Sequence, residues 1–493
     1  MDLLAFVRGC TFDDFLFTPQ LGVVASRNPD RLDLSARFTD RLTLKRPIVS
    51  ANMDTVTRAA MAVVLAEEGG IGVIDRGFRS GDIGPQVAEV SAVKRTQHGI
   101  IGDPHAISGD RSIREAVSVM DRTGVGTLVV VDPGRRLVGL LTRRDVRFAS
   151  LEATVADRMT SRPALVVHRG ELPLADAAGV MRDRKVKKLP LVDADDRVIG
   201  LITARDIIQH EEHPHATRDA RGRLCVAAAV GATGDFLERT AEVLQAGADA
   251  LVIDIAHGHS QVMAQAIEAI RRAHPDVDLV AGNVATAEGV RFLAERGVNA
   301  VKVGIGPGGG CTTRLTTNFG VPQVEALVRC RMATDGRVPL IADGGIRRHG
   351  GIAQALAFGG DTVMLGSAFA GTLETPGEIV LKSVVLPESQ RMVQVPFKVF
   401  RGMASIAAVR DRLDLEDADA GEVESLGAEG LEVSVPARGS VRSVIQDMLR
   451  HLCSAVSYAG VDSLPEFRRQ FLADPDRFLV KLSAASRVES FQR

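Results

Sequence analysis

The strongest chemical signal in the chain is a cysteine at the end of a glycine run. Residues 304–310 contain five glycines and one proline, Cys311 follows directly, and Thr313 lies two residues later. Glycine leaves room for a ligand beside the backbone, and exposed backbone N–H groups stabilise a thiolate, the nucleophilic form of cysteine. The sequence therefore predicts a nucleophilic thiol at Cys311. The alternative is a glycine-rich turn with an inert cysteine, since free cysteines are usually buried.

Two further loops could bind a nucleotide. Asp343 follows a predicted strand and precedes two glycines, and its carboxylate could accept hydrogen bonds from the vicinal hydroxyls of a ribose. Gly366 and Ser367 follow the next predicted strand, where backbone N–H groups that open a helix bind phosphate. Together with Cys311, these loops predict a site for a nucleoside monophosphate with a thiol directed at its base.

The elements that must position these loops alternate between short apolar runs and amphipathic segments. This alternation predicts parallel strands covered by helices, and so many units in series favour a closed (β/α)8 barrel. The polar residues that follow the strands would then share one mouth of the barrel. The predicted strands are 48–50, 71–74, 224–230, 250–255, 279–281, 300–303, 338–342 and 362–365, and the predicted helices include 236–245, 262–273, 287–295 and 324–331.

An internal repeat interrupts this pattern. Residues 139–145 (GLLTRRD) and 200–206 (GLITARD) are similar and offset by 61 positions, which indicates duplicated modules. We therefore expect three segments: residues 1–95 and 214–493 form the catalytic barrel, and residues 96–213 form an inserted tandem module.

The repeat resembles a pair of CBS modules, which bind adenine or guanine nucleotides. The resemblance implies that a threonine and an aspartate three residues later hold the ribose of ATP or GTP in each copy. The alternative is a purely structural pair in which the threonine caps the helix that its aspartate begins. The four residues are Thr142, Asp145, Thr203 and Asp206.

Composition excludes several classes of protein. The formal net charge of −2 gives no electrostatic reason to expect nucleic acid as a partner. The sequence contains no run of 18 apolar residues, so no membrane span is predicted. The N-terminus lacks a basic leader, and five scattered cysteines form neither a disulfide framework nor a metal cluster. We expect a cytoplasmic protein with no membrane partner.

Over nearly its whole length the chain resembles the IMP dehydrogenase/GMP reductase family. The resemblance implies that Cys311 attacks C2 of a purine nucleotide and that a nicotinamide cofactor exchanges hydride with that carbon. It further implies a monovalent cation, normally K⁺, on the carbonyl groups of Gly306, Gly308 and Cys311. The matching segments are 11–14, 50–56, 69–74, 254–260, 281–284, the Cys311 loop, 343–345 and 401–403.

The family also implies further site residues. Arg27 would reach the NADPH of a neighbouring subunit, and a surface arginine in a loop is the equally weighted alternative. Glu429 resembles the contact to the purine edge, and a solvated loop carboxylate is its alternative. The implied substrate-binding residues are Asp343, Gly344, Gly345, Gly366, Ser367, Arg401, Gly402, Met403, Ser405 and Glu429. The implied cofactor-binding residues are Ser26, Arg27, Asp254, Ile255, Ala256, Gly304, Ile305 and Gly306.

Local matches favour the reductase branch. Dehydrogenases hydrolyse the cysteine adduct with an Arg-Tyr pair on a mobile flap, but here Leu413 follows Arg412. Asn52 resembles the reductases, and an arginine such as Arg27 suits the 2′-phosphate of NADPH. We therefore predict an oxidoreductase that converts GMP and NADPH to IMP and ammonia, with Cys311 as nucleophile and Thr313 assisting proton transfer.

Other features point the other way. CBS modules, residues 374–378 and the length of the segment 403–429 resemble dehydrogenases. The reductase's ammonia-releasing glutamate is expected at position 406, which is isoleucine, and Asp411, Asp414 and Glu416 are the nearby substitutes. The alternatives are an NAD-dependent IMP dehydrogenase with an altered flap and a nucleotide-sensing protein without turnover.

The family also implies assembly and regulation. We expect a homotetramer, with an octamer as the larger alternative, whose activity responds to ATP or GTP. Gly309 and Phe400 replace family residues that hydrogen-bond to phosphate, and Asp75-Arg76 replaces a His-Lys pair, so substrate binding is expected to be weaker.

Overall fold

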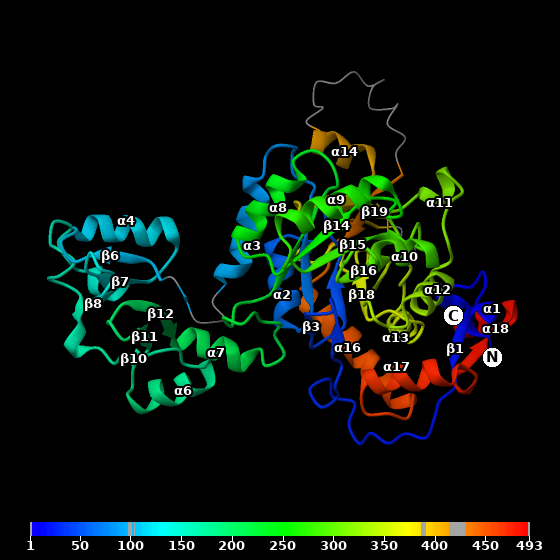
Figure 1. Ribbon diagram of the computed structural model, residues 1–493, viewed down its shortest axis with the longest axis horizontal. Helices are drawn as coiled ribbons and strands as arrows, with labels where there is room; N and C mark the ends of the chain where they lie inside the picture. Colours follow the sequence, from blue (N-terminus) through cyan, green and yellow to red (C-terminus); the bar gives the residue numbers. More distant parts are fainter. Residues whose placement is uncertain (1, 97–100, 103, 386–390, 414–428, 492–493) are drawn as a thin grey trace. The chain divides into compact units, whose positions relative to one another are not determined.

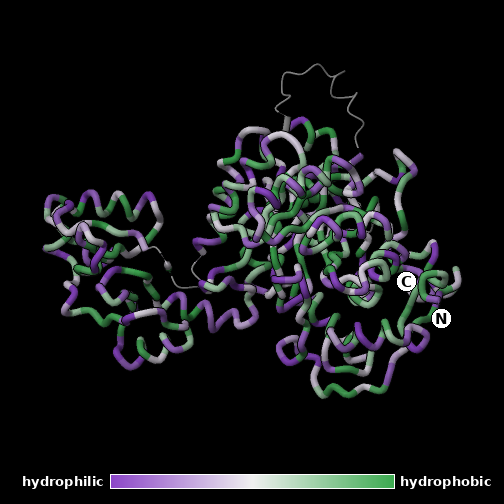
Figure 2. The backbone as a smooth tube through the Cα atoms, in the orientation of Figure 1, coloured by the Kyte–Doolittle hydropathy of each residue, from purple (hydrophilic) through white to green (hydrophobic). Residues whose placement is uncertain are grey.

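The computed structural model describes residues 2–96, 101–102, 104–385, 391–413 and 429–491 (Figure 1). The chain forms two compact units. One comprises residues 1–95, 215–217 and 224–493, and the other comprises residues 96–214 and 218–223. Figure 2 shows hydrophobic and hydrophilic stretches alternating along the backbone of both units.

The larger unit contains a closed barrel of eight parallel strands, which confirms the predicted (β/α)8 fold. The barrel closes where Val363 pairs with Ile48 and where Val226 pairs with Gly72. In order around the barrel the strands are β13 (Val226–Val230), β14 (Ala250–Asp254), β15 (Leu279–Val284), β16 (Ala300–Val303), β17 (Leu340–Asp343), β18 (Thr362–Leu365), β4 (Ile48–Ser50) and β5 (Ile71–Ile74).

Alternate residues of each strand face two different apolar layers. Ala227 and Ala229 join the layer inside the barrel, whereas Val226, Ala228 and Val230 join the layer that contacts the helices. Burial on both faces explains why the strands are almost uniformly apolar.

Helices cover the outside of the barrel. Helix α9 is typical: the hydroxyl of its N-cap Ser260 accepts a hydrogen bond from the Met263 N–H, and Met263, Ile267 and Ile270 point into the core. The covering helices are α2 (Ala59–Glu67), α3 (Gly84–Arg95), α8 (Phe236–Gln245), α9 (Gln261–Ala273), α10 (Ala287–Ala294), α12 (Gln323–Thr334), α13 (Gly350–Ala357), α16 (Val441–Tyr458) and α17 (Leu464–Ala473).

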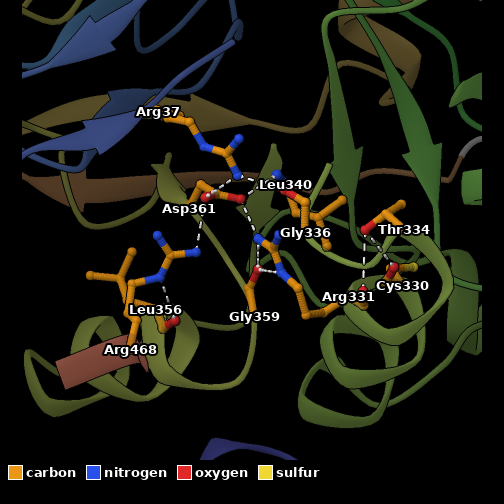
Figure 3. Close-up of polar contacts among 10 residues, drawn as sticks. All are labelled: Arg37, Cys330, Arg331, Thr334, Gly336, Leu340, Leu356, Gly359, Asp361 and Arg468. Carbon is orange, nitrogen blue, oxygen red and sulfur yellow. Dashed lines mark hydrogen bonds and ion pairs between the residues drawn. The ribbon is translucent and has the colours of Figure 1, made fainter. Parts of the chain in front are cut away.

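A buried ion cluster closes the amino end of the barrel (Figure 3). Asp361, which precedes β18, accepts hydrogen bonds from Arg468 at 2.9 Å, from Arg331 and from the Leu340 N–H at 2.9 Å, and Arg37 lies 3.4 Å away. Burial acts to raise the pKa of Asp361, but the arginines outweigh it and the pKa is lowered. The cluster joins α12, α17 and β2 (Ala36–Arg37) to the barrel.

The chain ends and one antiparallel sheet complete this unit. Strands β1 (Phe15–Phe17) and β22 (Leu479–Lys481) pair antiparallel, so a segment near the start of the chain lies beside one near its end (Figure 1). Strands β19 (Val380–Val385), β20 (Met392–Arg401) and β21 (Glu432–Pro436) form a sheet that delivers residues 400–405 and 429–431 to the Cys311 loop.

The second unit covers the residues predicted to form the inserted tandem module. Its two sheets have the orders β6-β7-β8-β9 and β10-β11-β12, each with its own apolar cluster. A third cluster that includes Val129, Leu140, Val192 and Leu201 joins the two repeats. The elements are β6 (Ala106–Ser108), α4 (Ile113–Thr123), β7 (Thr127–Val131), β8 (Leu137–Thr142), α5 (Arg143–Val146), β9 (Thr160–Ser161), β10 (His168–Arg169), α6 (Leu174–Asp183), β11 (Lys188–Val192), β12 (Val198–Thr203) and α7 (Ala204–Glu212).

Among the described residues, none of the helices combines the length and apolar character that crossing a membrane requires.

Candidate active site

A cavity of about 390 Å³ lies at the carboxyl ends of the barrel strands, where this fold places its chemistry. Most of the predicted site residues line it. These residues are Asp254, Ile255, Ala256, Gly304, Ile305, Gly306, Gly308, Cys311, Thr313, Asp343, Gly344, Gly345, Gly366, Ser367, Gly402, Met403 and Glu429.

At Cys311 the cavity holds a thiol, a hydroxyl and a carboxylate in sequence. The Cys311 Sγ lies 3.2 Å from the Thr313 Oγ1, and this hydroxyl donates a 2.6 Å hydrogen bond to the Glu429 Oε2. Thr313 begins the short helix α11 (Thr313–Thr316), which turns its side chain back towards the thiol. A proton can therefore pass between the thiol and the carboxylate through one hydroxyl.

Backbone contacts hold Glu429 in place. The Thr312 N–H donates to the Glu429 carbonyl at 2.9 Å, and the Leu431 N–H donates to the Gly310 carbonyl at 3.0 Å. The Gly402 N–H in turn donates to the Leu431 carbonyl at 2.9 Å. Three chain segments distant in sequence thus form one hydrogen-bonded assembly around the thiol.

This assembly requires glycine at two of its positions. A Cβ at Gly402 would lie 2.5 Å from the Gly310 carbonyl oxygen, and a Cβ at Gly430 would lie 2.7 Å from the Ser405 nitrogen. Backbone atoms cannot move aside as a flexible side chain can, so any larger residue at either position would displace Glu429 from Thr313.

A buried lysine organises the opposite wall of the cavity. Lys302 donates to the Asp254 Oδ1 at 2.7 Å and to the Asp343 Oδ2 at 3.0 Å. The Asn283 amide donates to the same Asp343 oxygen at 2.9 Å. Both hydrogen bonds described for the Asp343 carboxylate use Oδ2, which leaves Oδ1 for a ligand hydroxyl.

The charges of this wall stabilise one another. Burial acts to raise the pKa of Asp254, but Lys302 outweighs it and the pKa is lowered. Burial acts to lower the pKa of Lys302, but Asp254 and Asp343 outweigh it and the pKa is raised. Asp254 and Lys302 therefore form an ionised pair at neutral pH. Sequence analysis missed Lys302, although a lysine within the buried four-residue strand β16 is the signal that could have identified it.

Arg401 and Ser405 do not line this cavity. Arg401 donates to the Asp54 Oδ2 at 2.6 Å and to the Asp411 Oδ2 at 2.6 Å, and these residues line a second cavity of about 660 Å³. The Ser405 Oγ accepts a hydrogen bond from the Ala408 N–H at the start of α14 (Ile406–Leu413). Their roles in substrate binding stay predictions.

The position of Glu429 bears on the ammonia-releasing glutamate that reductases have at the position of Ile406. Ile406 is the first residue of α14, and Asp411 pairs with Arg401 rather than Thr313. Asp414 and Glu416 lie outside the described residues, as do the side chains of Arg412 and Leu413. Among the described residues, Glu429 is the carboxylate that contacts Thr313.

The segment predicted to reach a neighbouring cofactor contacts its own chain. The Arg27 Nε donates to the Ser457 Oγ at 3.2 Å, and its guanidinium lies 4.5 Å from the centre of the Tyr458 ring. The Ser26 hydroxyl accepts a hydrogen bond from the Asn28 N–H at 3.3 Å. Contact with a second subunit stays a prediction for both residues.

In the inserted unit, each Thr-Asp pair forms a capping box. The Thr142 Oγ1 donates to the Asp145 Oδ2 at 2.7 Å, and the Thr203 Oγ1 donates to the Asp206 Oδ2 at 2.7 Å. The pairs begin α5 and α7. This geometry agrees with the alternative in which each threonine caps a helix. Nucleotide binding by these residues stays a prediction.

Comparisons with known proteins agree with this geometry. A family model described as "IMP dehydrogenase / GMP reductase domain" matches residues 9–492. The chain is 40% identical to an inosine-5′-monophosphate dehydrogenase of Nitrosopumilus maritimus, covering 99% of this chain and 98% of that one. It is also 40% identical to the enzyme of that name from Aquifex aeolicus, covering 94% and 92%.

Solved structures from the other branch also match. A GMP reductase of Trypanosoma brucei, a cysteine-to-alanine variant in complex with guanosine 5′-monophosphate, superposes with a TM-score of 0.85 at 35% identity, covering 100% of this chain and 99% of that one. The reductase from the same organism in complex with guanosine 5′-triphosphate gives a TM-score of 0.75 at 33% identity, covering 97% and 98%.

Proposed function

This chain belongs to the IMP dehydrogenase/GMP reductase family of oxidoreductases, and we propose that it is a GMP reductase, which converts GMP and NADPH to IMP, NADP and ammonia. The observation that carries the proposal is the hydrogen-bonded sequence Cys311–Thr313–Glu429. The exocyclic amino group of the purine is a poor leaving group unless its nitrogen is protonated, when it can leave as ammonia, and Glu429 supplies a carboxylate that can hold that proton.

The cavity can accept each part of GMP. The Asp343 Oδ1 would accept hydrogen bonds from the ribose hydroxyls, and backbone N–H groups of the loops at Gly345 and Ser367 would bind the phosphate. The helix expected to begin at Ser367 is a series of turns instead. A Cβ at Gly309 would lie 3.5 Å from the Ser367 side chain, so glycine there leaves that hydroxyl accessible. With ribose and phosphate held in this way, the purine is directed at Cys311.

The residues at Cys311 can carry the proton transfers. The thiol proton passes through the Thr313 hydroxyl to Glu429, and the thiolate sulfur bonds to C2 of the purine as the C2–N3 double bond becomes a single bond. Glu429 returns the proton, again through Thr313, to the exocyclic nitrogen, whose bond to C2 breaks as ammonia leaves. When bound, the nicotinamide cofactor would supply hydride to C2, the C2–sulfur bond would break as the C2–N3 double bond re-forms to give IMP, and one proton from solvent would restore the Cys311 thiol.

The cavity wall formed by residues 254–256 and 304–306 fits a nicotinamide nucleotide. The buried Asn283 Oδ1 has no hydrogen-bond partner among the described residues and suits an amide N–H donor such as a carboxamide. When bound, NADPH supplies the hydride. Arg27 would contact the 2′-phosphate from a neighbouring subunit.

The Cys311 loop offers carbonyl oxygens of the kind that hold K⁺. The Gly308 carbonyl accepts a 3.1 Å hydrogen bond from the Cys311 N–H and retains a second lone pair. Gly306, Gly308 and Cys311 would be the ligands of this monovalent cation.

The second candidate function is IMP dehydrogenase, which the names of the 40% identical relatives favour. That reaction requires activated water, and Leu413 stands where the flap tyrosine is expected. The inserted module does not decide between the two, because a reductase of T. brucei matches this chain over its full length.

One assay separates the candidates. With GMP and NADPH we expect NADPH absorbance at 340 nm to decrease, and with IMP and NAD we expect no NADH to form. Cys311→Ala should abolish the first reaction while preserving the fold, as measured by circular dichroism. NADH formation from IMP would support the dehydrogenase. Nucleotide binding with no turnover in either direction would support a sensor.

We further propose that ATP or GTP regulates a homotetrameric or octameric enzyme through Thr142, Asp145, Thr203 and Asp206. A relative crystallised with GTP supports triphosphate binding within the family. Titrating activity against ATP and GTP tests this proposal, and flat curves for both nucleotides would overturn it.

A further inference from the structure

Three potential metal ligands converge on the outside of the barrel, in a cluster distinct from the active-site cavity. His349 immediately precedes α13, and Asp447 and His451 lie one turn apart on α16. The His349 Nδ1 lies 3.2 Å from the His451 Nδ1 and 3.4 Å from the Asp447 Oδ2. The His451 Nδ1 lies 3.7 Å from the Asp447 Oδ1.

The 3.2 Å separation of the two imidazole nitrogens is close to one edge of a tetrahedral coordination sphere, and the Asp447 carboxylate presents Oδ2 to His349 and Oδ1 to His451. With metal–nitrogen and metal–oxygen bonds of about 2.0–2.2 Å, two ligand atoms of a tetrahedral Zn²⁺ site lie about 3.3–3.6 Å apart. To coordinate one ion, the His451 Nδ1 exchanges its 2.8 Å contact with the Asp447 carbonyl for the metal, and one Asp447 oxygen turns to face both imidazoles. One ligand comes from the loop before α13 and two come from α16, so the ion would join these elements.

Hydrogen bonding alone satisfies this arrangement poorly. The His451 Nδ1 also lies 2.8 Å from the Asp447 backbone carbonyl, so it faces a carbonyl, a carboxylate and a second imidazole nitrogen. A neutral Nδ1 can donate one proton or accept one, and cannot serve all three neighbours. A cation instead accepts lone pairs from both imidazoles and the carboxylate.

We propose that His349, Asp447 and His451 form a binding site for a divalent transition-metal ion, with Zn²⁺ the best match to two imidazoles and one carboxylate. Their side chains are 38%, 55% and 42% exposed for His349, His451 and Asp447, so water can occupy the fourth position. Arg450 lies 3.4 Å from the Asp447 Oδ1. Such an exposed ion pair contributes little and can yield to the metal.

The site has a structural connection to the catalytic cavity. Ile346 lines that cavity three residues before His349, on the loop that carries Asp343 and the two glycines. A bound ion would restrain the far end of this loop against α16.

The experiment measures Zn²⁺ binding to the full-length, untagged protein after removal of metal with a chelator. Because a thiolate also binds Zn²⁺, the Cys311→Ala chain is the parent for all variants. Competition with a chromophoric chelator gives the affinity and stoichiometry. Co²⁺ serves as a second probe, because its visible absorption reports tetrahedral coordination.

We expect one Zn²⁺ per chain and a weakening of at least about tenfold in His451→Ala, His349→Ala and Asp447→Asn. His105→Ala, which removes an exposed histidine of the inserted unit, is the matched control and should bind as the parent does. Unchanged stoichiometry and affinity in all three variants, or no binding by the parent, would overturn the proposal. Circular dichroism of each variant shows whether a loss reflects unfolding.

Discussion

Both ends of the barrel contain carboxylates that pair with cations, yet the two ends differ in how many of the carboxylate oxygens have hydrogen-bond partners. At the amino end, three arginines and one backbone N–H surround both oxygens of Asp361 (Figure 3). At the carboxyl end, Asp343 uses Oδ2 for both Lys302 and Asn283, and Glu429 uses Oε2 for Thr313.

This difference indicates that the network at the amino end has a structural role and the network at the carboxyl end has a role in substrate binding and catalysis. A saturated network has no capacity for a ligand, so its value lies in holding elements together. A network at a cavity in which some carboxylate oxygens have no partner can accept hydrogen bonds from a substrate, but it stabilises the fold less. The contrast predicts that substitutions at the amino end reduce stability and those at the carboxyl end reduce turnover.

The largest expected effect is the loss of turnover in Glu429→Gln. Glutamine preserves the size of the side chain and accepts a hydrogen bond from Thr313, but it cannot hold the proton that ammonia release requires. We expect GMP-dependent NADPH oxidation to fall by about 10²–10⁴-fold, measured at saturating substrate. An unchanged rate would show that Glu429 is a spectator, and unchanged thermal unfolding is the control.

At the opposite end, Asp361→Asn should destabilise the protein by about 3–5 kcal/mol, because it leaves buried arginines without a countercharge. Urea-induced unfolding measures this loss. The KM for GMP should stay unchanged in the protein that remains folded. If Asp361→Asn had normal stability and reduced turnover, the proposed structural role of the amino end would be contradicted.

Asp75 lies beside the mouth of the barrel, and its burial is expected to make the stability of the protein depend on pH. Burial raises its pKa to about 6, against the partial compensation of Arg58. The folded state therefore binds the proton more tightly than the unfolded chain does. The stability this proton provides is complete below about pH 4 and is lost as the pH rises through 6, an effect of about 3 kcal/mol.

Asp75→Asn cannot ionise, so its unfolding midpoint relative to the unsubstituted chain should be higher at pH 8 than at pH 4.5. Thermal unfolding of both proteins at the two pH values provides the test. An equal difference at both pH values would mean that Asp75 titrates normally.

The smallest expected effects lie in the inserted unit. Thr203→Ala removes a capping hydroxyl and should cost about 1 kcal/mol of stability. If Thr203 also holds ribose, the affinity for ATP or GTP should fall by about tenfold, the equivalent of about 1.4 kcal/mol. Thr203→Ser retains the hydroxyl and is the matched control. A loss of stability without weaker nucleotide binding would leave only the structural role.

Local sequence patterns could predict the barrel and the residues at its mouth, because apolar periodicity and strand ends are local features. They could not predict the pairs that matter most. Thr313 and Glu429 are 116 residues apart and Lys302 and Asp343 are 41 apart, so only the folded chain shows which carboxylate each one contacts.

The position of Arg401 shows a second limit. It precedes Gly402, which lines the cavity, but it lies at the end of β20, where side chains alternate between faces. Phe400 lines the active-site cavity, whereas Arg401 lines the second cavity. Sequence adjacency to a site therefore did not place the side chain within it.

The most direct test of the proposed function is the stoichiometry of ammonia. With GMP as substrate, the unsubstituted chain should release one ammonia for each NADPH oxidised, and Cys311→Ala and Glu429→Gln should lose both signals together. NADH formation from IMP and NAD, without ammonia release from GMP, would contradict the account.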